Sequence, residues 1–312
     1  MGVLLAIDIG GTQLRTALYT LEGMKALKIE RAATLGQEPG VFDRLVALID
    51  SIWPEEPVEA MAVAVPGPIN PFTGTIVETP NIPELTHFPL REKLAERFRV
   101  PVFPGNDANL AALGEWTFGA GRGHHDLIYM TISTGIGGGV IVNDQLLLGH
   151  HGLAAELGHV TVLPDGPVCG CGQRGHLEAI ASGTGIARYV AEKLAEGRPS
   201  TLSAKANPGA AEIAAAAASG DALAREAFAF AGEFIGIGLA NYLQIFNPSL
   251  VILGGGVSQS GSLILDPIKA SLRSHAMNPE FLDGFELTTA QLGDDVGLLG
   301  ALAYARILLG KK

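Results

Sequence analysis

Two cysteines and two histidines lie close together near the middle of the chain. Cys169 and Cys171 are separated by a single residue, and His159 and His176 lie on either side of the pair. A disulfide between cysteines at this spacing would be strained, whereas two thiolates and two imidazoles supply the four ligands of tetrahedral zinc. The pattern predicts a structural zinc site. An empty pair of buried thiols is the alternative.

Glycines follow two apolar segments that have the composition of buried strands. Asp8-Ile9-Gly10-Gly11-Thr12 ends the first segment, and Ser133-Thr134-Gly135-Ile136-Gly137-Gly138 ends the second. Backbone amides at such turns approach phosphates closely, Thr12 and Thr134 add hydroxyls, and the Asp8 carboxylate holds Mg²⁺ directly or through water. One such turn alone is equally well explained as a hairpin. The duplication favours two turns that face one nucleoside triphosphate, since the chain has no G-x-x-x-x-G-K-[ST] loop.

The strands that carry these turns form a weak internal repeat. Residues 3–9 and 13–19 are the strands expected around the first turn, and 127–133 and 139–142 are those expected around the second. Strands alternate with helices elsewhere, which predicts an α/β fold with partly parallel sheets and ligands at the carboxyl ends of strands. The other expected strands are 60–65, 100–103 and 250–253, and the expected helices are 41–53, 90–98, 108–116, 183–196, 210–218, 221–246 and 295–309.

The repeat divides the chain into two predicted domains. Its 312 residues also favour two domains, at about 150 residues each. We expect residues 1–118 to form a smaller N-terminal domain, with the last helix, 297–312, packing back on it. Residues 119–296 would form a larger domain that carries the cysteine and histidine motif. The glycine-rich segment 119–125 is the expected linker.

The composition excludes several classes of protein. With 47% hydrophobic and 17% charged residues, the chain is not of the disordered type. Its 32 acidic and 21 basic residues give a net charge of -11, which argues against nucleic-acid binding. The most apolar long stretch, 227–246, contains Glu233, Asn241 and Gln244, which argues against a membrane span. Because the N-terminus lacks a basic signal-peptide segment and cysteines are few, we expect a cytoplasmic protein.

These motifs resemble those of a known family. The two glycine turns are similar to the phosphate motifs of the actin, hexokinase and heat-shock ATPase superfamily, and Leu253-Gly254-Gly255-Gly256 resembles its adenosine motif. Glu156-Leu157-Gly158-His159 and the later segment CGCGQRGHLE resemble the repressor, open reading frame and kinase (ROK) family, especially its bacterial glucokinases. The likeness extends from Ala6 to Ala303. It implies a two-domain actin/hexokinase-like (ribonuclease H-like) α/β fold, with the active site in a cleft between the domains.

The resemblance implies a catalytic role for the loop Gly105-Asn106-Asp107-Ala108-Asn109. In the family's catalytic loop the aspartate accepts the proton of a sugar hydroxyl, so Asp107 would be the catalytic base. The local alternative is that Asn106 or Asp107 caps the helix expected to begin at Ala108. The two roles are compatible, because a cap position fixes a side chain near the end of a strand.

The resemblance also implies the residues that bind sugar and nucleotide. Sugar hydroxyls need several fixed partners, because an unpaired buried polar group costs about 1–3 kcal/mol. For Glu156 or Glu178 alone, a solvated surface carboxylate is the ordinary alternative. The implied sugar ligands are Asn81, Asn106, Asp107, Glu156, His159 and Glu178, and the implied nucleotide contacts are Asp8, Gly10, Gly11, Thr12, Thr134, Gly135, Gly254 and Gly255.

The zinc motif departs from the family pattern at one position. The family usually has a third cysteine where His176 stands, so one thiolate is replaced by a neutral imidazole, which weakens or retunes the site. In the family, the histidine matching His159 contacts the metal with one nitrogen and the sugar with the other. By that analogy, zinc orients the sugar pocket and takes no part in the chemistry.

The activity implied by the resemblance is the phosphorylation of a hexose by ATP with Mg²⁺, glucose to glucose 6-phosphate first of all, in a homodimer. Kinases for fructose, N-acetylmannosamine, N-acetylglucosamine and allose share these motifs, and polyphosphate stays open as the donor. A sugar-responsive regulator is the alternative from another class. Such regulators carry a winged-helix segment before the first phosphate strand, which here starts at Val3, and this argues against DNA binding. The zinc motif disfavours an actin-like or chaperone ATPase.

Overall fold

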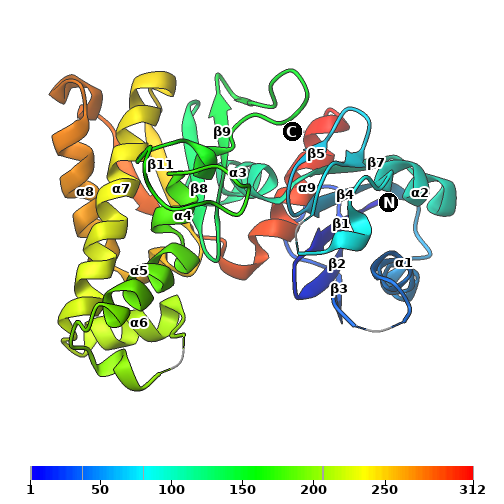
Figure 1. Cartoon of the computed structure of the whole chain (residues 1–312). Coiled ribbons are helices and arrows are strands. Elements are labelled where there is room, and N and C mark those ends of the chain that lie inside the picture. Colours follow the sequence, from blue (N-terminus) through cyan, green and yellow to red (C-terminus); the bar gives the residue numbers. More distant parts are fainter. Residues whose placement is uncertain (1, 37, 80, 206, 312) are drawn as a thin grey trace.

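Two five-stranded sheets form the framework of the protein. The computed structural model describes residues 2–36, 38–79, 81–205 and 207–311 (Figure 1). The N-terminal sheet has the order β3-β2-β1-β4-β7, with β1 at Val3–Ile9, β2 at Gln13–Thr20, β3 at Lys28–Ala33, β4 at Val58–Val65 and β7 at Val102–Asn106. The C-terminal sheet has the order β10-β9-β8-β11-β12, with β8 at Leu127–Ile132, β9 at Ile136–Val142, β10 at Gln145–Leu146, β11 at Leu250–Gly254 and β12 at Glu286–Thr289.

The two sheets share one arrangement of strands. In each, an antiparallel hairpin (β1–β2 or β8–β9) continues on its other side into parallel strands (β4 and β7, or β11 and β12). The α/β class expected from the sequence is therefore confirmed. A separate short hairpin pairs β5 (Ile69–Asn70) with β6 (Thr75–Ile76). Because both glycine turns connect the strands of such a hairpin, they occupy equivalent positions in the two sheets.

Helices cover the outer sides of the framework. On the N-terminal sheet, α1 packs against β2 and β3, and α2 packs against β7. Helices α4 to α8 gather on the side of the C-terminal sheet away from the N-terminal one (Figure 1). The helices are α1 (Val41–Ile52), α2 (Leu90–Phe98), α3 (Asp107–Phe118), α4 (Leu177–Ala181), α5 (Gly183–Ala195), α6 (Ala210–Ala218), α7 (Ala222–Phe246), α8 (Ser262–His275) and α9 (Val296–Leu308).

The two sheets exchange helices. Helix α3 follows β7 of the N-terminal sheet yet packs against β8 and β9, whereas α9 follows β12 of the C-terminal sheet and packs against β1 and β4. The two helices also pack on each other, and in Figure 1 they lie between the sheets. One buried core cluster accordingly draws residues from both sheets and both helices, among them Ala6, Leu113, Tyr129 and Leu302.

Small residues bring α3 and α9 together. A Cβ at Gly114 would lie 3.0 Å from the Gly300 nitrogen, and a Cβ at Gly300 would overlap the Leu110 carbonyl oxygen. The fully buried carboxylate of Glu115 then accepts hydrogen bonds from the backbone amides of Ala120, at 2.9 Å, and of Gln291 and Leu292, both at 2.8 Å. The end of α3 is thereby fixed to the segment that leads into α9.

Helix α7 is the one helix of the described residues that is long and apolar enough to cross a membrane. It is a core helix, because 61% of its most apolar window is buried inside the molecule. Asp221 caps its first turn by accepting the Ala224 amide at 2.9 Å. Cβ atoms at Gly232 and Gly236 would lie 2.7 Å from Pro267 and 2.5 Å from Ser271 of α8, so these glycines allow the two helices to pack closely.

The second glycine segment differs from the prediction. Strand β9 begins at Ile136, not at 139, so Gly137 and Gly138 lie in a strand and not in a turn. The reason is packing, which here overrides the low strand propensity of glycine. Cβ atoms at Gly137 and Gly139 would lie 3.1 and 2.6 Å from the Cβ atoms of Ala108 and Ala112 on α3.

The sequence analysis also missed whole elements. Strand β3 lies at the sheet edge and carries Lys28, Glu30 and Arg31, so its pattern lacks the apolar run of a buried strand. Strand β12 and helices α4 and α8 were likewise not expected, and α8 contains Pro267 in its interior. Tertiary contacts decide the conformation of such segments, because their local signals are weak or contradictory.

We predict that Gly300→Ala destabilises the protein more than Gly209→Ala does. The new methyl group would overlap the Leu110 carbonyl oxygen, and overpacking of this kind costs about 1–3 kcal/mol. At Gly209 nothing lies within 4 Å of the Cβ position. Urea denaturation measures the free energy of unfolding of both variants. Equal values would contradict the close crossing of α3 and α9.

Candidate active site

The first glycine turn connects β1 to β2, with Asp8 near its start. The Gly10 amide donates to the Gln13 carbonyl at 2.9 Å and closes the turn. Asp8 forms an ion pair with Arg15 on β2, whose Nε lies 3.1 Å from Asp8 Oδ2. Arg15 also donates to the Asp294 carbonyl oxygen at 2.5 Å, just before α9. The sequence analysis did not single out Arg15; its register opposite Asp8 in a predicted hairpin was the available signal.

The second turn, Ser133 to Gly135, is fixed by the start of α5. The Ser133 amide donates to Gly135 O at 2.9 Å, and Ser133 O accepts the Gly183 amide at 2.7 Å. Thr134 O accepts the Thr184 hydroxyl at 3.0 Å. The N-terminus of a helix carries partial positive charge and free amides, both of which favour anions. The geometry therefore places a helix N-terminus beside the predicted phosphate turn.

A cavity opens beside this second turn. Its volume is about 380 Å³, within the range of small-molecule sites. The lining is apolar, with hydroxyl groups and backbone as its polar part. It consists of Ser133, Thr134, Gly183, Thr184, Ala187, Gly209, Ala210, Ala211, Ala214, Phe228, Gly256, Val257 and Ser260.

Of the predicted nucleotide contacts, Thr134 lies in this lining, whereas Gly254 and Gly255 are outside it and directly precede Gly256, which lies in it. A Cβ at Gly254 would overlap the Tyr129 hydroxyl, and one at Gly255, whose φ is +82°, would overlap Ile132 O. These two glycines are thus required by the backbone path, and Gly256 beside them faces the cavity. The helix expected at 183–196 is confirmed as α5, but the sequence analysis did not connect its Ser-Gly-Thr-Gly start with the phosphate turn.

Asp107, the predicted catalytic base, is the first residue of α3, directly after β7. Its Oδ1 accepts the Ala108 amide at 2.8 Å. Burial raises the pKa of Asp107 to about 7, against the lowering effect of that hydrogen bond, and the negative charges of Asp8 and Glu156 raise it further. A carboxyl group with a pKa near neutrality is a stronger base than an ordinary aspartate.

Asn106 is the N-cap of α3. Its Oδ1 accepts the Asn109 amide at 3.0 Å, and its Nδ2 donates to Gly67 O at 3.1 Å. The capping alternative raised for this loop therefore describes Asn106. The same two bonds fix the end of β7, from which the Asp107 carboxylate projects.

The remaining predicted sugar ligands come from three other segments. Glu156 is the N-cap of the short 3₁₀ helix Leu157–His159 and His159 is its last residue, and the His159 amide donates to Glu156 O at 3.0 Å. Desolvation raises the pKa of Glu156, His159 lowers it and Glu178 raises it, so these groups share one electrostatic environment. Asn81 lies beside the first turn: a Cβ added at Gly11 would be 3.8 Å from the Asn81 Cβ.

Glu178, on the first turn of α4, contacts the second glycine turn. Its Oε2 accepts the Ile136 amide at 2.9 Å, and the Cys169 thiol donates to its Oε1 at 3.5 Å. The carboxylate is therefore not a free surface group, because it has one partner in the glycine segment and one in the cysteine segment. It lies between the predicted phosphate turn and the predicted zinc ligands.

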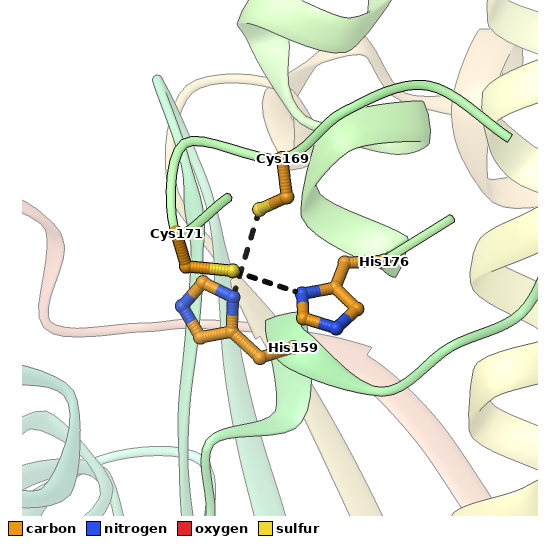
Figure 2. Close-up of side chains that lie close together, drawn as sticks. All are labelled: His159, Cys169, Cys171 and His176. Atoms are coloured by element: carbon orange, nitrogen blue, oxygen red, sulfur yellow. Dashed lines mark hydrogen bonds between the residues drawn. The ribbon is translucent and has the colours of Figure 1, made fainter. Parts of the chain in front are cut away.

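The four predicted zinc ligands converge (Figure 2). The potential ligand atoms of His159, Cys169, Cys171 and His176 all lie within 4.8 Å of one another. The Cys169 Sγ to His159 Nδ1 distance is 3.7 Å, and the Cys171 Sγ to His176 Nδ1 distance is 3.2 Å. Zinc bonds of about 2.3 Å to sulfur and 2.1 Å to nitrogen give a tetrahedral edge of about 3.6 Å. The donor set and its spacing fit zinc.

The protonation of this cluster also matters for metal binding. Burial raises the pKa of the Cys169 thiol to about 11, and burial together with His159 lowers the pKa of His176. The imidazole is therefore already neutral, as a metal ligand must be, whereas the thiol must release its proton. Metal binding here should accordingly release protons and strengthen as the pH rises.

The chain was compared with known proteins. The model of the ROK family matches residues 4–307. A glucokinase of Thermotoga maritima is 36% identical over 320 residues, covering 98% of both chains. A xylose repressor of Bacillus spizizenii is 33% identical over 304 residues, which is 96% of this chain and 76% of the repressor.

Solved structures agree with these sequence relatives. The crystal structure of a ROK family glucokinase from Streptomyces griseus, in complex with glucose and AMPPNP, has a TM-score of 0.82 and 37% identity. The match covers 98% of this chain and 100% of that one. The expected actin/hexokinase-like fold is therefore confirmed.

We predict that the protein, purified without chelator, contains about one zinc ion per chain, the content of one four-ligand site. Cys169→Ser should lose most of this zinc and unfold at a lower temperature, because metal binding is coupled to folding. His176→Cys, which restores a third thiolate, should retain the metal. Elemental analysis by mass spectrometry and thermal denaturation test this. Absence of zinc from the wild-type protein would disprove the site.

Proposed function

The chain belongs to the ROK family, and from that membership we propose that it is a glucokinase, a sugar kinase that phosphorylates glucose to glucose 6-phosphate with ATP. The observation that carries the proposal is Asp107, a buried carboxylate at the start of α3 whose pKa is raised by burial and by the charges of Asp8 and Glu156. The similarity to glucokinases extends over 98% of this chain and supports glucose as the sugar.

The proposed reaction is an in-line transfer of the γ-phosphoryl group. Asp107 accepts the proton of the attacking sugar hydroxyl as the new O–P bond forms and the bond to the β-phosphate oxygen breaks. The leaving nucleoside diphosphate takes the displaced electron pair, and Asp107 later releases the proton to solvent. Asn106, through its bonds to Asn109 and Gly67, fixes the backbone that aims the carboxylate. Mg²⁺ accompanying the nucleotide neutralises phosphate charge during the transfer.

We assign the nucleotide to the two turns and the adjoining cavity. Gly10, Gly11 and Thr12 contribute the first turn, Thr134 and Gly135 contribute the second, and Gly254 and Gly255 lead into Gly256 of the cavity lining. The amides at the N-terminus of α5 add donors for the phosphates. Asp8 is the proposed metal carboxylate, and it has to exchange part of its ion pair with Arg15 to serve as one.

We assign the sugar to the polar side chains around Asp107. Four separate segments supply these residues, which surround a sugar ring more fully than one element could: Asn81, Asn106, Glu156 with His159, and Glu178. His159 directs Nδ1 to the thiol cluster, which leaves Nε2 for a sugar hydroxyl. His159, Cys169, Cys171 and His176 would hold the zinc, which would make this loop more rigid.

The remaining assignments extend this proposal. The chain works as a cytoplasmic homodimer without nucleic acid, and its domains are 1–118 with the last helix, and 119–296. A sugar-responsive regulator without catalysis is the second candidate, supported by the similarity to a xylose repressor. A kinase for another hexose would use the same residues as the proposed glucokinase. It would differ in the shape of the sugar pocket, on which discrimination among sugars depends.

A coupled assay of ADP release over a panel of hexoses tests the function. We expect turnover with glucose and ATP, and a kcat/KM for glucose above that for fructose, N-acetylmannosamine, N-acetylglucosamine and allose. Polyphosphate in place of ATP tests the donor by direct measurement of glucose 6-phosphate. Binding of glucose without turnover on any sugar would favour the regulator.

The raised pKa of Asp107 predicts the pH dependence. The carboxyl group becomes a base only as the pH rises through about 7, so kcat/KM should fall about tenfold per unit below that value. Asp107→Asn should bind glucose but lose turnover by orders of magnitude. Near-normal kcat in this variant would remove Asp107 from its role.

The same variant has a second readout. The folded protein holds the Asp107 proton with a pKa of about 7 instead of the ordinary 3.8, so stability decreases as the pH rises from 3.8 to about 7. Asp107→Asn lacks this ionisation and should be more stable than the wild type at pH 8. Thermal denaturation at pH 5 and 8 measures the difference.

A further inference from the structure

The Glu178 carboxylate lies between the residues assigned to the nucleotide and those assigned to the sugar. Its Oε2 accepts the Ile136 amide at 2.9 Å, immediately after the second phosphate turn. A Cβ at Gly135 would overlap that oxygen, so the glycine is required for the carboxylate to reach the turn. Ser133 and Thr134 of the turn also line the adjoining cavity, to which we assigned the nucleotide.

The other side of Glu178 faces the polar residues assigned to the sugar. Its Oε1 accepts the Cys169 thiol at 3.5 Å, and its charge raises the pKa of Glu156. Glu178 follows His176 by two residues on the same helix start, so the metal cluster limits its movement. A carboxylate has about four lone-pair sites, and the Ile136 amide and the Cys169 thiol use two of them. Acceptor sites therefore remain for sugar hydroxyls.

We propose that Glu178 couples the two substrates, so that sugar bound to this carboxylate orders the second phosphate turn through Ile136 and strengthens nucleotide binding. The inference rests on the proposed function and goes beyond it, because Glu178 acts as a positioning residue for the nucleotide in addition to binding sugar. Ordering the turn costs conformational entropy once, so the second ligand to bind meets a smaller cost.

Thermodynamic linkage makes this coupling reciprocal. If glucose raises the affinity for nucleotide by some factor, nucleotide raises the affinity for glucose by the same factor, typically 5–150-fold for coupled sites, as an order of magnitude. A change on the turn side must therefore alter sugar binding, and a change on the sugar side must alter nucleotide binding. A residue with only a local role would not produce this crossed effect.

Calorimetric titrations of the full chain, loaded with zinc, test the proposal. Glucose and AMPPNP with Mg²⁺ are titrated each alone and each in the presence of the other, which gives the coupling factor. In the wild type we expect glucose to raise the affinity for AMPPNP at least about fivefold. Glu178→Ala should bring the factor close to one. Glu178→Gln, whose amide oxygen can still accept the Ile136 amide, should recover part of it.

Gly135→Ala supplies the crossed measurement. The methyl group displaces the Glu178 carboxylate, so this variant should weaken glucose binding with no nucleotide present and lower the coupling factor. Asp126→Asn is the matched control, because Asp126 also accepts a backbone amide, that of Asn143 at 2.8 Å, but lies outside the site. Its coupling factor should equal that of the wild type.

Two results would overturn the inference. One is a wild-type coupling factor of one in an enzyme that turns over glucose, which would leave the proposed function intact. The other is an unchanged factor in both Glu178→Gln and Gly135→Ala. If Glu178→Ala does not fold by circular dichroism, these two variants decide the question. Absence of both glucose binding and turnover in the wild type would instead defeat the proposed function.

Discussion

The close crossing of α3 and α9 is the constraint on which the rest of the structure depends. Each helix leaves one sheet and packs on the other, and glycines at the crossing let the backbones meet. The crossing also sets the chemistry, because α3 begins at Asp107 and α9 begins against Asp8. A Cβ at Gly297 of α9 would lie 2.6 Å from Asp8 Oδ2. The two candidate carboxylates are thus held by the same pair of helices that joins the sheets.

Acidic groups in this region act on one another through space. Asp8 and Glu156 raise the pKa of Asp107, and Glu178 raises that of Glu156. Arg15 offsets part of this charge at Asp8. Like charges kept close in a partly desolvated site cost stability, and such sites are where perturbed pKa values serve a function. This group of carboxylates therefore favours ligands that carry positive charge or hydroxyl groups.

The sequence predicted those features that depend on a local pattern of residues. Long apolar runs identified β1 and β8, helical periodicity identified α7, and the spacing of cysteines and histidines identified a cluster whose side chains do converge. It failed where separate segments decide the result. Thr184, Ala210 and Phe228 belong to no motif in the sequence and become parts of one cavity lining only after folding. Gly137 was taken for a turn because nothing local revealed that α3 would pack against it.

The position of α9 has a consequence for biosynthesis. Residues 296–308 cover β1 and β4, which are translated far earlier. Until α9 has been synthesised, the face of β1 and β4 that it covers stays exposed in the nascent chain. Exposed apolar surface of this kind promotes aggregation or binding by chaperones. A premature stop a few codons before α9 would therefore leave the first sheet without part of its core, although all of the candidate site residues would have been translated.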